Sequence, residues 1–216
     1  MRYVWALCLV LLPRAALACG LPVCLTDPDV LTFAHVITFE DTRSSMGPGH
    51  RIDGLLVMDG AQFGERFAGQ SLAPTGDHDA VTGAPLPPLV LMSGPPGQNL
   101  SVVHMTGNNV LNGYGAAGFP KRRAQGEGAI SVLFDRDQSA LSFQLRGGEA
   151  GQAQVVFLRR DGSLISTLDL TDLGEHAIGF LRSQGQADIA GFVLTNTDPQ
   201  GLALDNLRFD RPPNLS

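Results

Sequence analysis

Apolar and polar side chains alternate with a period of two along most of this chain, the spacing of half-buried β-strands. The alternation is clearest over residues 129–135 and 141–146. It places two sets of three apolar side chains on one face of each segment: Ile130, Val132 and Phe134, then Leu141, Phe143 and Leu145. Similar but shorter runs lie at 35–40, 52–58, 100–105, 153–159, 164–170, 175–182, 187–195 and 201–210. Long helical periodicity is absent, so the pattern predicts an all-β protein with many turns.

Turn-forming residues separate these runs. Arg160-Asp161-Gly162 is a strong hairpin signal, and Asp135 to Gln138 is expected to form the turn between the two clearest strands. Asn108-Asn109 and Asn112-Gly113 are also expected to be turns. Residues 71–88 and 113–125 read as long loops, because glycine and proline are frequent in them. The spacing of strands and turns predicts a two-sheet sandwich.

The last strand, 201–210, carries a carboxylate in an apolar setting. Period two places Ala203, Leu207 and Phe209 on one face with Asp205 among them, and places Asn206 on the opposite face. A carboxylate on an apolar face is unfavourable unless something pairs with it. Backbone N–H groups, an arginine or a metal ion are the partners open to Asp205 at this point.

Residues 1–18 have the features of a signal peptide: a basic start, an apolar core from Tyr3 to Leu12 and a small-x-small cleavage site at Ala16–Ala18. The mature chain would then begin at Cys19. In an exported protein we expect a Cys19–Cys24 disulfide, which closes a short loop. A lipoprotein with lipid on Cys19 is the alternative. Either way the chain is expected to be secreted or periplasmic.

The charge of the chain argues against nucleic acid as a partner. The full chain has 15 Lys and Arg against 21 Asp and Glu, and only Arg2 and Arg14 lie within 1–18, which leaves 13 against 21 and a net charge of −8. The densest basic run is Lys121-Arg122-Arg123, too small a footprint for phosphate binding. The mature chain has no apolar run long enough to span a membrane.

Four segments together resemble the secreted bacterial proteins of the PEP-CTERM-associated type: Ile37–Asp41, Ala129–Phe134, Arg160–Gly162 and Leu204–Phe209. The layout is also similar to galactose-binding-like modules. The resemblance implies an antiparallel jelly-roll β-sandwich over 33–211, after an N-terminal extension over 19–32 and before a tail at 212–216. This chain lacks the sorting tail of those proteins, which favours free secretion or periplasmic residence.

The same resemblance implies a structural calcium ion. In many calcium-containing jelly rolls an acidic residue after the first core strand and an aspartate in the last strand share the ion. The matching residues here are Glu40 and Asp205, with Asp41 as a further candidate ligand. Calcium takes six to eight oxygen ligands, so carboxylates at these positions suit it chemically. Such an ion would join the two ends of the sandwich.

Motifs of catalysis are scarce in this chain. There is no Gly-x-Ser-x-Gly elbow, P-loop, His-Glu-x-x-His or dinucleotide fingerprint. A glycosidase needs two carboxylates across a sugar; Glu40 is a candidate for one of them and the other is not evident. Asp77-His78-Asp79 is the densest set of metal-ligand side chains, but adjacent residues of an extended segment point apart, so we expect a solvated loop.

Sugar binding is the remaining alternative. Carbohydrate modules stack sugars on exposed aromatic rings, and the mature chain has no tryptophan and a single tyrosine, Tyr114. Asn112 and Tyr114 are therefore the candidate ligand-binding residues, unless Tyr114 serves to pack its loop. We expect an exported, non-catalytic β-sandwich that binds an unknown ligand, with a glycan as one candidate, or that forms part of an envelope or matrix. A glycosidase-like hydrolase using Glu40 is the alternative from another class.

Overall fold

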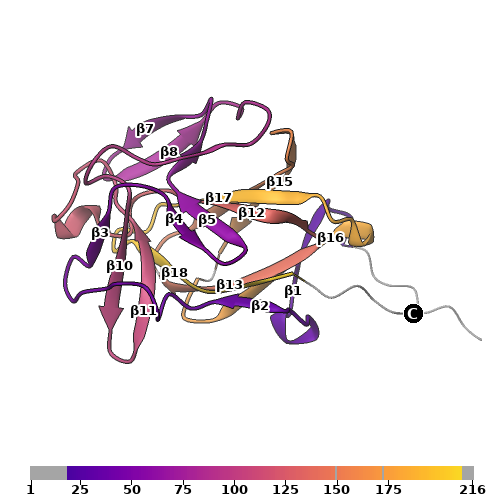
Figure 1. Ribbon diagram of the computed structural model, residues 1–216, viewed down its shortest axis with the longest axis horizontal. Coiled ribbons are helices and arrows are strands. Elements are labelled where there is room, and N and C mark those ends of the chain that lie inside the picture. The colour runs from indigo at the N-terminus through magenta and orange to yellow at the C-terminus, as the bar shows by residue number, and fades with distance from the viewer. Residues whose placement is uncertain (1–18, 149, 172, 211–216) are drawn as a thin grey trace, which may run out of the picture.

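The computed structural model describes residues 19–148, 150–171 and 173–210 and is almost entirely β-structure (Figure 1). The expected signal peptide and the tail at 212–216 lie outside the described residues. Two antiparallel sheets pack face to face, so the expected all-β sandwich is confirmed. Its jelly-roll connectivity stays a prediction.

The first sheet has eight strands in the spatial order β1-β16-β13-β18-β11-β10-β3, with β2 also paired to β18. Their bounds are β1 Val23–Thr26, β2 His35–Ile37, β3 His50–Ile52, β10 Leu100–Met105, β11 Asn108–Gly113, β13 Ala140–Gly147, β16 Ala177–Arg182 and β18 Leu202–Phe209. The last strand β18 therefore lies at the centre of the sheet, between β13 and β11.

The second sheet has six strands in the order β15-β14-β17-β12-β5-β4. Their bounds are β4 Leu56–Met58, β5 Ala61–Gly64, β12 Ile130–Gln138, β14 Ala153–Leu158, β15 Leu164–Leu170 and β17 Ile189–Asn196. The predicted Arg160-Asp161-Gly162 hairpin is confirmed as the turn between β14 and β15.

A smaller layer covers the outer face of the second sheet. It consists of the pair β6 (Arg66–Phe67) and β9 (Leu91–Met92) and of the hairpin β7 (Ser71–Thr75) and β8 (His78–Thr82). Figure 1 shows β7 and β8 above β17 and β12. A second apolar cluster lies in this region, made up of Phe67, Leu89, Leu91, Leu158, Ala190 and Val193, with Val81, Leu133 and Val156 packed against it.

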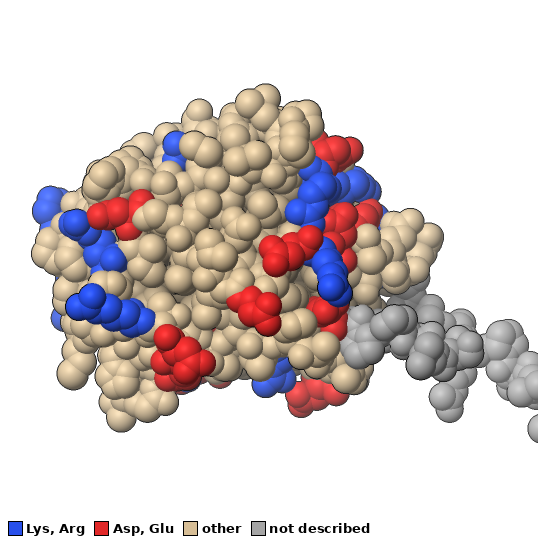
Figure 2. All heavy atoms as spheres, viewed as in Figure 1, with Lys and Arg blue, Asp and Glu red and all other residues tan. Residues whose placement is uncertain are grey.

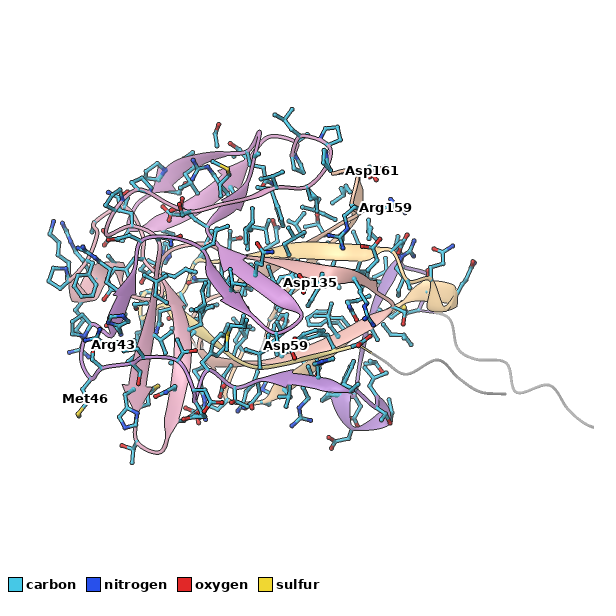
Figure 3. The ribbon with its side chains drawn as sticks, in the orientation of Figure 1. Arg43, Met46, Asp59, Asp135, Arg159 and Asp161 are labelled. Atoms are coloured by element: carbon cyan, nitrogen blue, oxygen red, sulfur yellow. A yellow bond between two sulfur atoms is a disulfide. The ribbon has the colours of Figure 1, made fainter. Side chains whose placement is uncertain are left out.

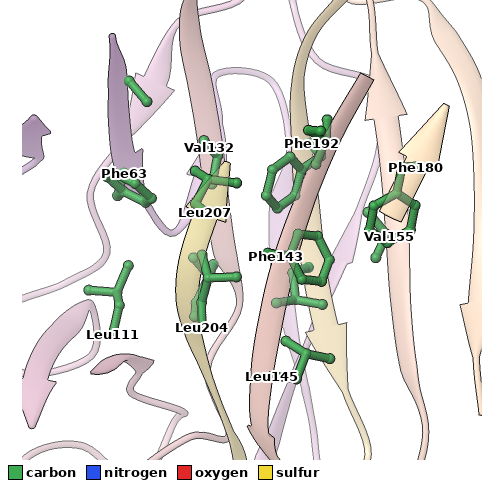
Figure 4. Packing of buried hydrophobic residues seen from close by; sticks show 14 of the residues in the cluster. Phe63, Leu111, Val132, Phe143, Leu145, Val155, Phe180, Phe192, Leu204 and Leu207 are labelled. Carbon is green, nitrogen blue, oxygen red and sulfur yellow. The ribbon is translucent and has the colours of Figure 1, made fainter. Parts of the chain in front are cut away.

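The main core lies between the two sheets, and Figure 4 shows part of it. The side chains expected to face inward from 129–135 and 141–146 all belong to it, so this part of the period-two prediction is confirmed. Phenylalanine dominates the packing: the rings of Phe143 and Phe192 lie 5.5 Å apart and those of Phe157 and Phe180 lie 5.2 Å apart. Such aromatic contacts add to the free energy gained from burial alone.

The prediction for the last strand holds for Leu207 and Phe209, which face the core, but is wrong for Ala203 and Asp205, because β18 contains a bulge. Ser142 of β13 pairs with Arg208 whereas Gln144 pairs with Asp205, so two residues of β18 oppose Phe143. Asn206 has a φ of 48°, in the left-handed region that asparagine tolerates better than most residues. The bulge returns Leu207 to the core, and Asp205 lies instead on the outer face beside Gln144.

Three other local predictions are also corrected. Residues 135–138 do not form a turn; β12 runs on to Gln138, with a register shift after Leu133. Residues 108–113 form β11 and not a pair of turns. The expected loop 71–88 contains the β7–β8 hairpin, in which Pro74 is tolerated because β7 is an edge strand.

Three 3₁₀ helices complete the described elements: η1 Pro28–Val30, η2 Arg122–Ala124 and η3 Ser183–Gly185. Within the described ranges, none of the helices has the length and apolar character that crossing a membrane requires.

Candidate functional site

Asp205 is completely buried, although it lies on the outer face of the first sheet. Its Oδ1 accepts a hydrogen bond from the backbone N–H of Asn206 at 2.7 Å. Its Oδ2 accepts one from Asn108 Nδ2 at 2.7 Å and another from Asn206 Nδ2 at 3.0 Å. The side chain of Asn206 thus folds back onto Asp205, which corrects the prediction that it points to the opposite face.

An arginine completes the surroundings of Asp205. Arg146 Nε lies 3.8 Å from Asp205 Oδ2, and the same guanidinium donates to Glu175 Oε2 at 2.6 Å. The sequence left open whether Asp205 pairs with backbone N–H groups, with an arginine or with a metal ion. In the structure it has both N–H donors and a nearby arginine. A buried carboxylate with these partners is compensated within the protein itself.

Glu40 reaches the same hairpin from the other end of the chain. Its Oε1 accepts a hydrogen bond from the backbone N–H of Asn109 at 2.8 Å, and Asn109 Nδ2 donates to the carbonyl oxygens of Phe39 and Glu40. Phe39, with a φ of 60°, turns the chain at this point. The β10–β11 hairpin therefore links the segment after β2 with β18 through Asn108 and Asn109. Asp41 is exposed.

The donor set around Asp205 does not fit a calcium ion well. Ca²⁺ is held by oxygen atoms, whereas both oxygens of Asp205 already accept hydrogen bonds from N–H groups. Glu40 Oε1 is likewise engaged by an N–H group. Among the described residues, no group of three or more His, Cys, Asp or Glu side chains is arranged to hold a metal ion. Calcium at Glu40, Asp41 and Asp205 stays a prediction.

The two candidate sugar-binding residues are buried. Asn112 lies within β11, and Tyr114 is 1% exposed. The hydroxyl of Tyr114 donates to the carbonyl oxygen of Pro48 at 2.9 Å, and its ring contacts that of Phe119. Burial raises the pKa of Tyr114 to about 12. The alternative role for Tyr114, the packing of its loop, is therefore confirmed, and its ring is not available for stacking on a sugar.

Cys19 and Cys24 form the expected disulfide, with their Cα atoms 5.9 Å apart. Cys24 belongs to β1, the edge strand that pairs with β16. The bond therefore ties the N-terminal tip to the edge of the first sheet. It also uses the sulfur atom on which the lipoprotein alternative would carry lipid.

A cavity of about 180 Å³, which the sequence pattern does not indicate, lies between the β4–β5 turn of the second sheet and the start of β2 and the end of β18 in the first sheet. It is lined by the start of β2, the β4–β5 turn, the irregular part of β12 and the end of β18: His35, Asp59, Gly60, Asp135, Arg136, Gln138, Phe209 and Asp210. Figure 3 shows Asp59 and Asp135 on the same side of the molecule. The sequence missed this site because its residues come from four separate segments, each ordinary on its own.

The imidazole of His35 stands between two carboxylates at this cavity. Its Nε2 lies 3.6 Å from Asp59 Oδ2 and its Nδ1 lies 3.3 Å from Asp210 Oδ2. The ring stacks on Phe209 at 5.4 Å. Gly60 allows the close approach of the turn, because a Cβ atom there would lie 2.8 Å from the Phe209 ring. The carboxylates can accept hydrogen bonds from hydroxyl or ammonium groups of a ligand.

A second polar cluster lies beneath the β7–β8 hairpin. Glu65 and Asp79 are 1% and 5% exposed. Glu65 Oε2 accepts a hydrogen bond from Arg66 at 2.7 Å, but Glu65 Oε1 and Asp79 Oδ2 are buried without a hydrogen-bond partner among the described residues. Burial, followed by the nearby charge of Asp79, raises the pKa of Glu65 to about 7; burial raises that of Asp79 to about 6.

Glu127 and His78 border the same cluster. Glu127 is 3% exposed, and its Oε2 contacts Nδ1 of His78. Burial is the main cause that raises the pKa of Glu127 to about 7, with Asp198 and Asp77 adding to it. The predicted solvated loop is therefore wrong for His78 and Asp79, which belong to β8, whereas Asp77 lies in an exposed turn. The expected divergence of adjacent side chains does hold, since His78 meets Glu127 whereas Asp79 lies near Glu65.

Figure 2 shows charged side chains on the left and right of this view and acidic side chains near its middle, below a broad area of uncharged atoms. No protein-family model matches the chain, and a search of curated proteins also finds no match. The fold and the sites therefore define the class: a two-sheet antiparallel β-sandwich with a disulfide at its N-terminal tip.

Proposed function

We propose that this chain is an exported, non-catalytic β-sandwich that binds a ligand or serves as a component of an envelope or extracellular matrix. Export is supported by the signal-peptide features of residues 1–18 and by the Cys19–Cys24 disulfide, since disulfides persist in oxidising compartments. The resemblance to secreted proteins of the PEP-CTERM-associated type supports the same compartment.

The cavity beside His35 is the single observation that carries the binding part of the proposal. It offers about 180 Å³ of space bordered by the carboxylates of Asp59, Asp135 and Asp210. A group of acceptors in a concave site suits a ligand that brings several hydroxyl groups or an ammonium group. A glycan is therefore the second candidate ligand, and we propose that its binding site is this cavity and not Asn112 and Tyr114.

A glycan array on the purified mature protein tests the binding part, with aminated as well as neutral glycans on it. We expect binding that is weakened at least fivefold in Asp135→Asn, whereas Asp169→Asn, an exposed aspartate on β15, binds as the wild type does. Asp135 is exposed, so its substitution should leave the fold intact. Binding that survives Asp135→Asn unchanged would move the site elsewhere.

A glycosidase panel tests the alternative that the protein is a hydrolase. Glu40 is exposed and accepts a hydrogen bond from Asn109, so we expect no turnover from wild type. Turnover that Glu40→Gln abolishes would overturn the non-catalytic proposal. No binding on the glycan array and no turnover in the glycosidase panel would leave a role in an envelope or matrix as the remaining proposal.

Intact mass of the exported protein tests the compartment and the N-terminus. We expect a chain that begins at Cys19 and gains about two daltons on reduction, as one disulfide requires. A lipid adduct on Cys19 would establish the lipoprotein alternative.

Thermal melts with Ca²⁺ and with a chelator test the calcium prediction. A melting temperature that rises with Ca²⁺ in the wild type, but not in Asp205→Ala, would support it.

A further inference from the structure

The β7–β8 hairpin is attached to the sandwich by a mixture of apolar and polar contacts. Val81 packs on the apolar cluster at the outer face of the second sheet. The backbone N–H of Asp79 donates to the carbonyl oxygen of Glu127 at 3.0 Å. The hairpin turn lies close to Gly115, where a Cβ atom would be 2.4 Å from the carbonyl oxygen of Asp77. The hairpin is thus a separate cover over apolar side chains of the second sheet.

The carboxyl groups beneath this cover have oxygens that lack partners. Glu65 Oε1 and Asp79 Oδ2 are both buried without a hydrogen-bond partner among the described residues. Glu65 is packed tightly, since a Cβ atom on Gly94 would lie 2.6 Å from Oε1. A buried oxygen without a partner is costly when the group is charged and much less so when the group is protonated.

The charged groups around this pair and around Glu127 come from several segments. Arg66 of β6 holds Glu65 Oε2, and His78 of β8 contacts Glu127. The remaining neighbours are acidic and raise the pKa of Glu127: Asp198 after β17 and Asp77 in the hairpin turn. Asp198 has its own donors in the backbone N–H groups of Ala150 and Gln200. Acidic groups outnumber basic ones, so each ionisation adds repulsion.

We propose that the β7–β8 hairpin is a pH-dependent cover, which protonation of the buried carboxyls of Glu65 and Asp79 holds closed and their ionisation loosens. At acid pH the pair is neutral or carries a single charge beside Arg66. At alkaline pH both groups are charged and buried next to each other. Opening lets water reach both carboxylates and exposes the apolar outer face of the second sheet around Val156 and Val193.

The carboxyl of Glu127 adds to this effect, because it is buried as well and its ionisation is disfavoured in the same way. The raised pKa values of Asp79, about 6, and of Glu65 and Glu127, about 7, place the transition near neutral pH. Acid therefore favours the closed hairpin through several groups together.

Amide hydrogen exchange on the purified protein tests the proposal, at about pH 5.5 and about pH 8 with correction for the intrinsic base dependence. We expect corrected protection over residues 71–82 to fall roughly tenfold at the higher pH, equivalent to one unit of pKa linkage. The β14–β15 hairpin serves as the internal control and should keep its protection. Binding of the dye ANS should rise over the same pH range, because apolar surface is exposed.

Two variants make the test specific. Asp79→Asn and Glu65→Gln keep the size of the side chain but cannot ionise, so each should reduce the pH dependence of residues 71–82. Asp169→Asn, at an exposed position of β15, should leave it unchanged. If Glu65→Gln does not fold, Asp79→Asn alone decides, because the oxygen of its amide can still accept from the Ala129 N–H. Equal corrected protection at both pH values, or a pH dependence that Asp79→Asn leaves intact, would overturn the proposal.

Discussion

Asp205 and Glu65 are both almost completely buried, yet their surroundings differ. Asp205 accepts three hydrogen bonds and has Arg146 nearby, all from residues of the first sheet and its hairpins. Glu65 has one hydrogen-bonded cation, one oxygen without a described partner, and a second buried carboxyl close to it. The first site stabilises a charge, whereas the second resists one.

The difference shows that burial alone does not decide the role of a carboxylate. Hydrogen bonds to the charged form favour it, and desolvation with like charges nearby disfavours it. The Asp205 site therefore serves as a fixed structural connection between β18 and the β10–β11 hairpin. The Glu65–Asp79 site is instead sensitive to pH, so it is the better place to look for regulation.

Removal of Asp205 should have the largest effect on stability. Asp205→Ala removes the acceptor of Asn108 Nδ2, one of the two acceptors of Asn206 Nδ2 and the negative charge beside Arg146, so we expect a loss of about 3 kcal/mol in the free energy of unfolding. Urea unfolding measures it. Arg208→Ala, at an exposed position of the same strand, is the control and should stay within about 0.5 kcal/mol.

The pH dependence of global stability should be the next largest effect. Glu65 and Glu127 have pKa values of about 7 and Asp79 of about 6 in the folded protein, all above their unfolded values. The folded state thus binds more protons, and these groups favour folding most below pH 4 and progressively less as pH rises through 7. We expect a net loss of about 2 kcal/mol between pH 5 and 8, measured by urea unfolding. Stability that rises over this range would contradict it.

The bulge at Asn206 can be tested by two substitutions at one position. Asn206→Ala must adopt a φ of 48° without the hydrogen bonds to Asp205 and Gln144, so we expect a loss of about 2 kcal/mol. Asn206→Gly adopts that φ without strain and should lose less, about 1 kcal/mol. Thermal melts of both variants make the comparison. Equal losses would show that the conformation of the bulge contributes little.

The link from Glu40 to the hairpin should have the smallest effect. Glu40→Gln keeps an acceptor for the Asn109 N–H and removes only the charge, so we expect less than about 1 kcal/mol at this exposed position. Asp41→Asn serves as the matched control with no expected change. A loss as large as that of Asp205→Ala would mean that the two carboxylates act through a shared ion after all.

The sequence alone predicted the strands of the main core because their pattern is local. Alternation over 129–135 and 141–146 requires only that one face be apolar, and the same side chains form the core. The Arg160-Asp161-Gly162 turn was predictable for the same reason. The Cys19–Cys24 disulfide followed from two cysteines a short distance apart in a chain that was expected to be exported.

The positions of the carboxylates were decided by tertiary structure alone. One extra residue in β18 moves Asp205 from the expected core face to the outer face, and period two cannot reveal where a bulge occurs. Asp79 lies near Glu65 and is hydrogen-bonded to the backbone of Glu127, which are 14 and 48 positions away in the sequence. A strand follows from the alternation of its own residues, but the charge state of a side chain follows from what distant segments place around it.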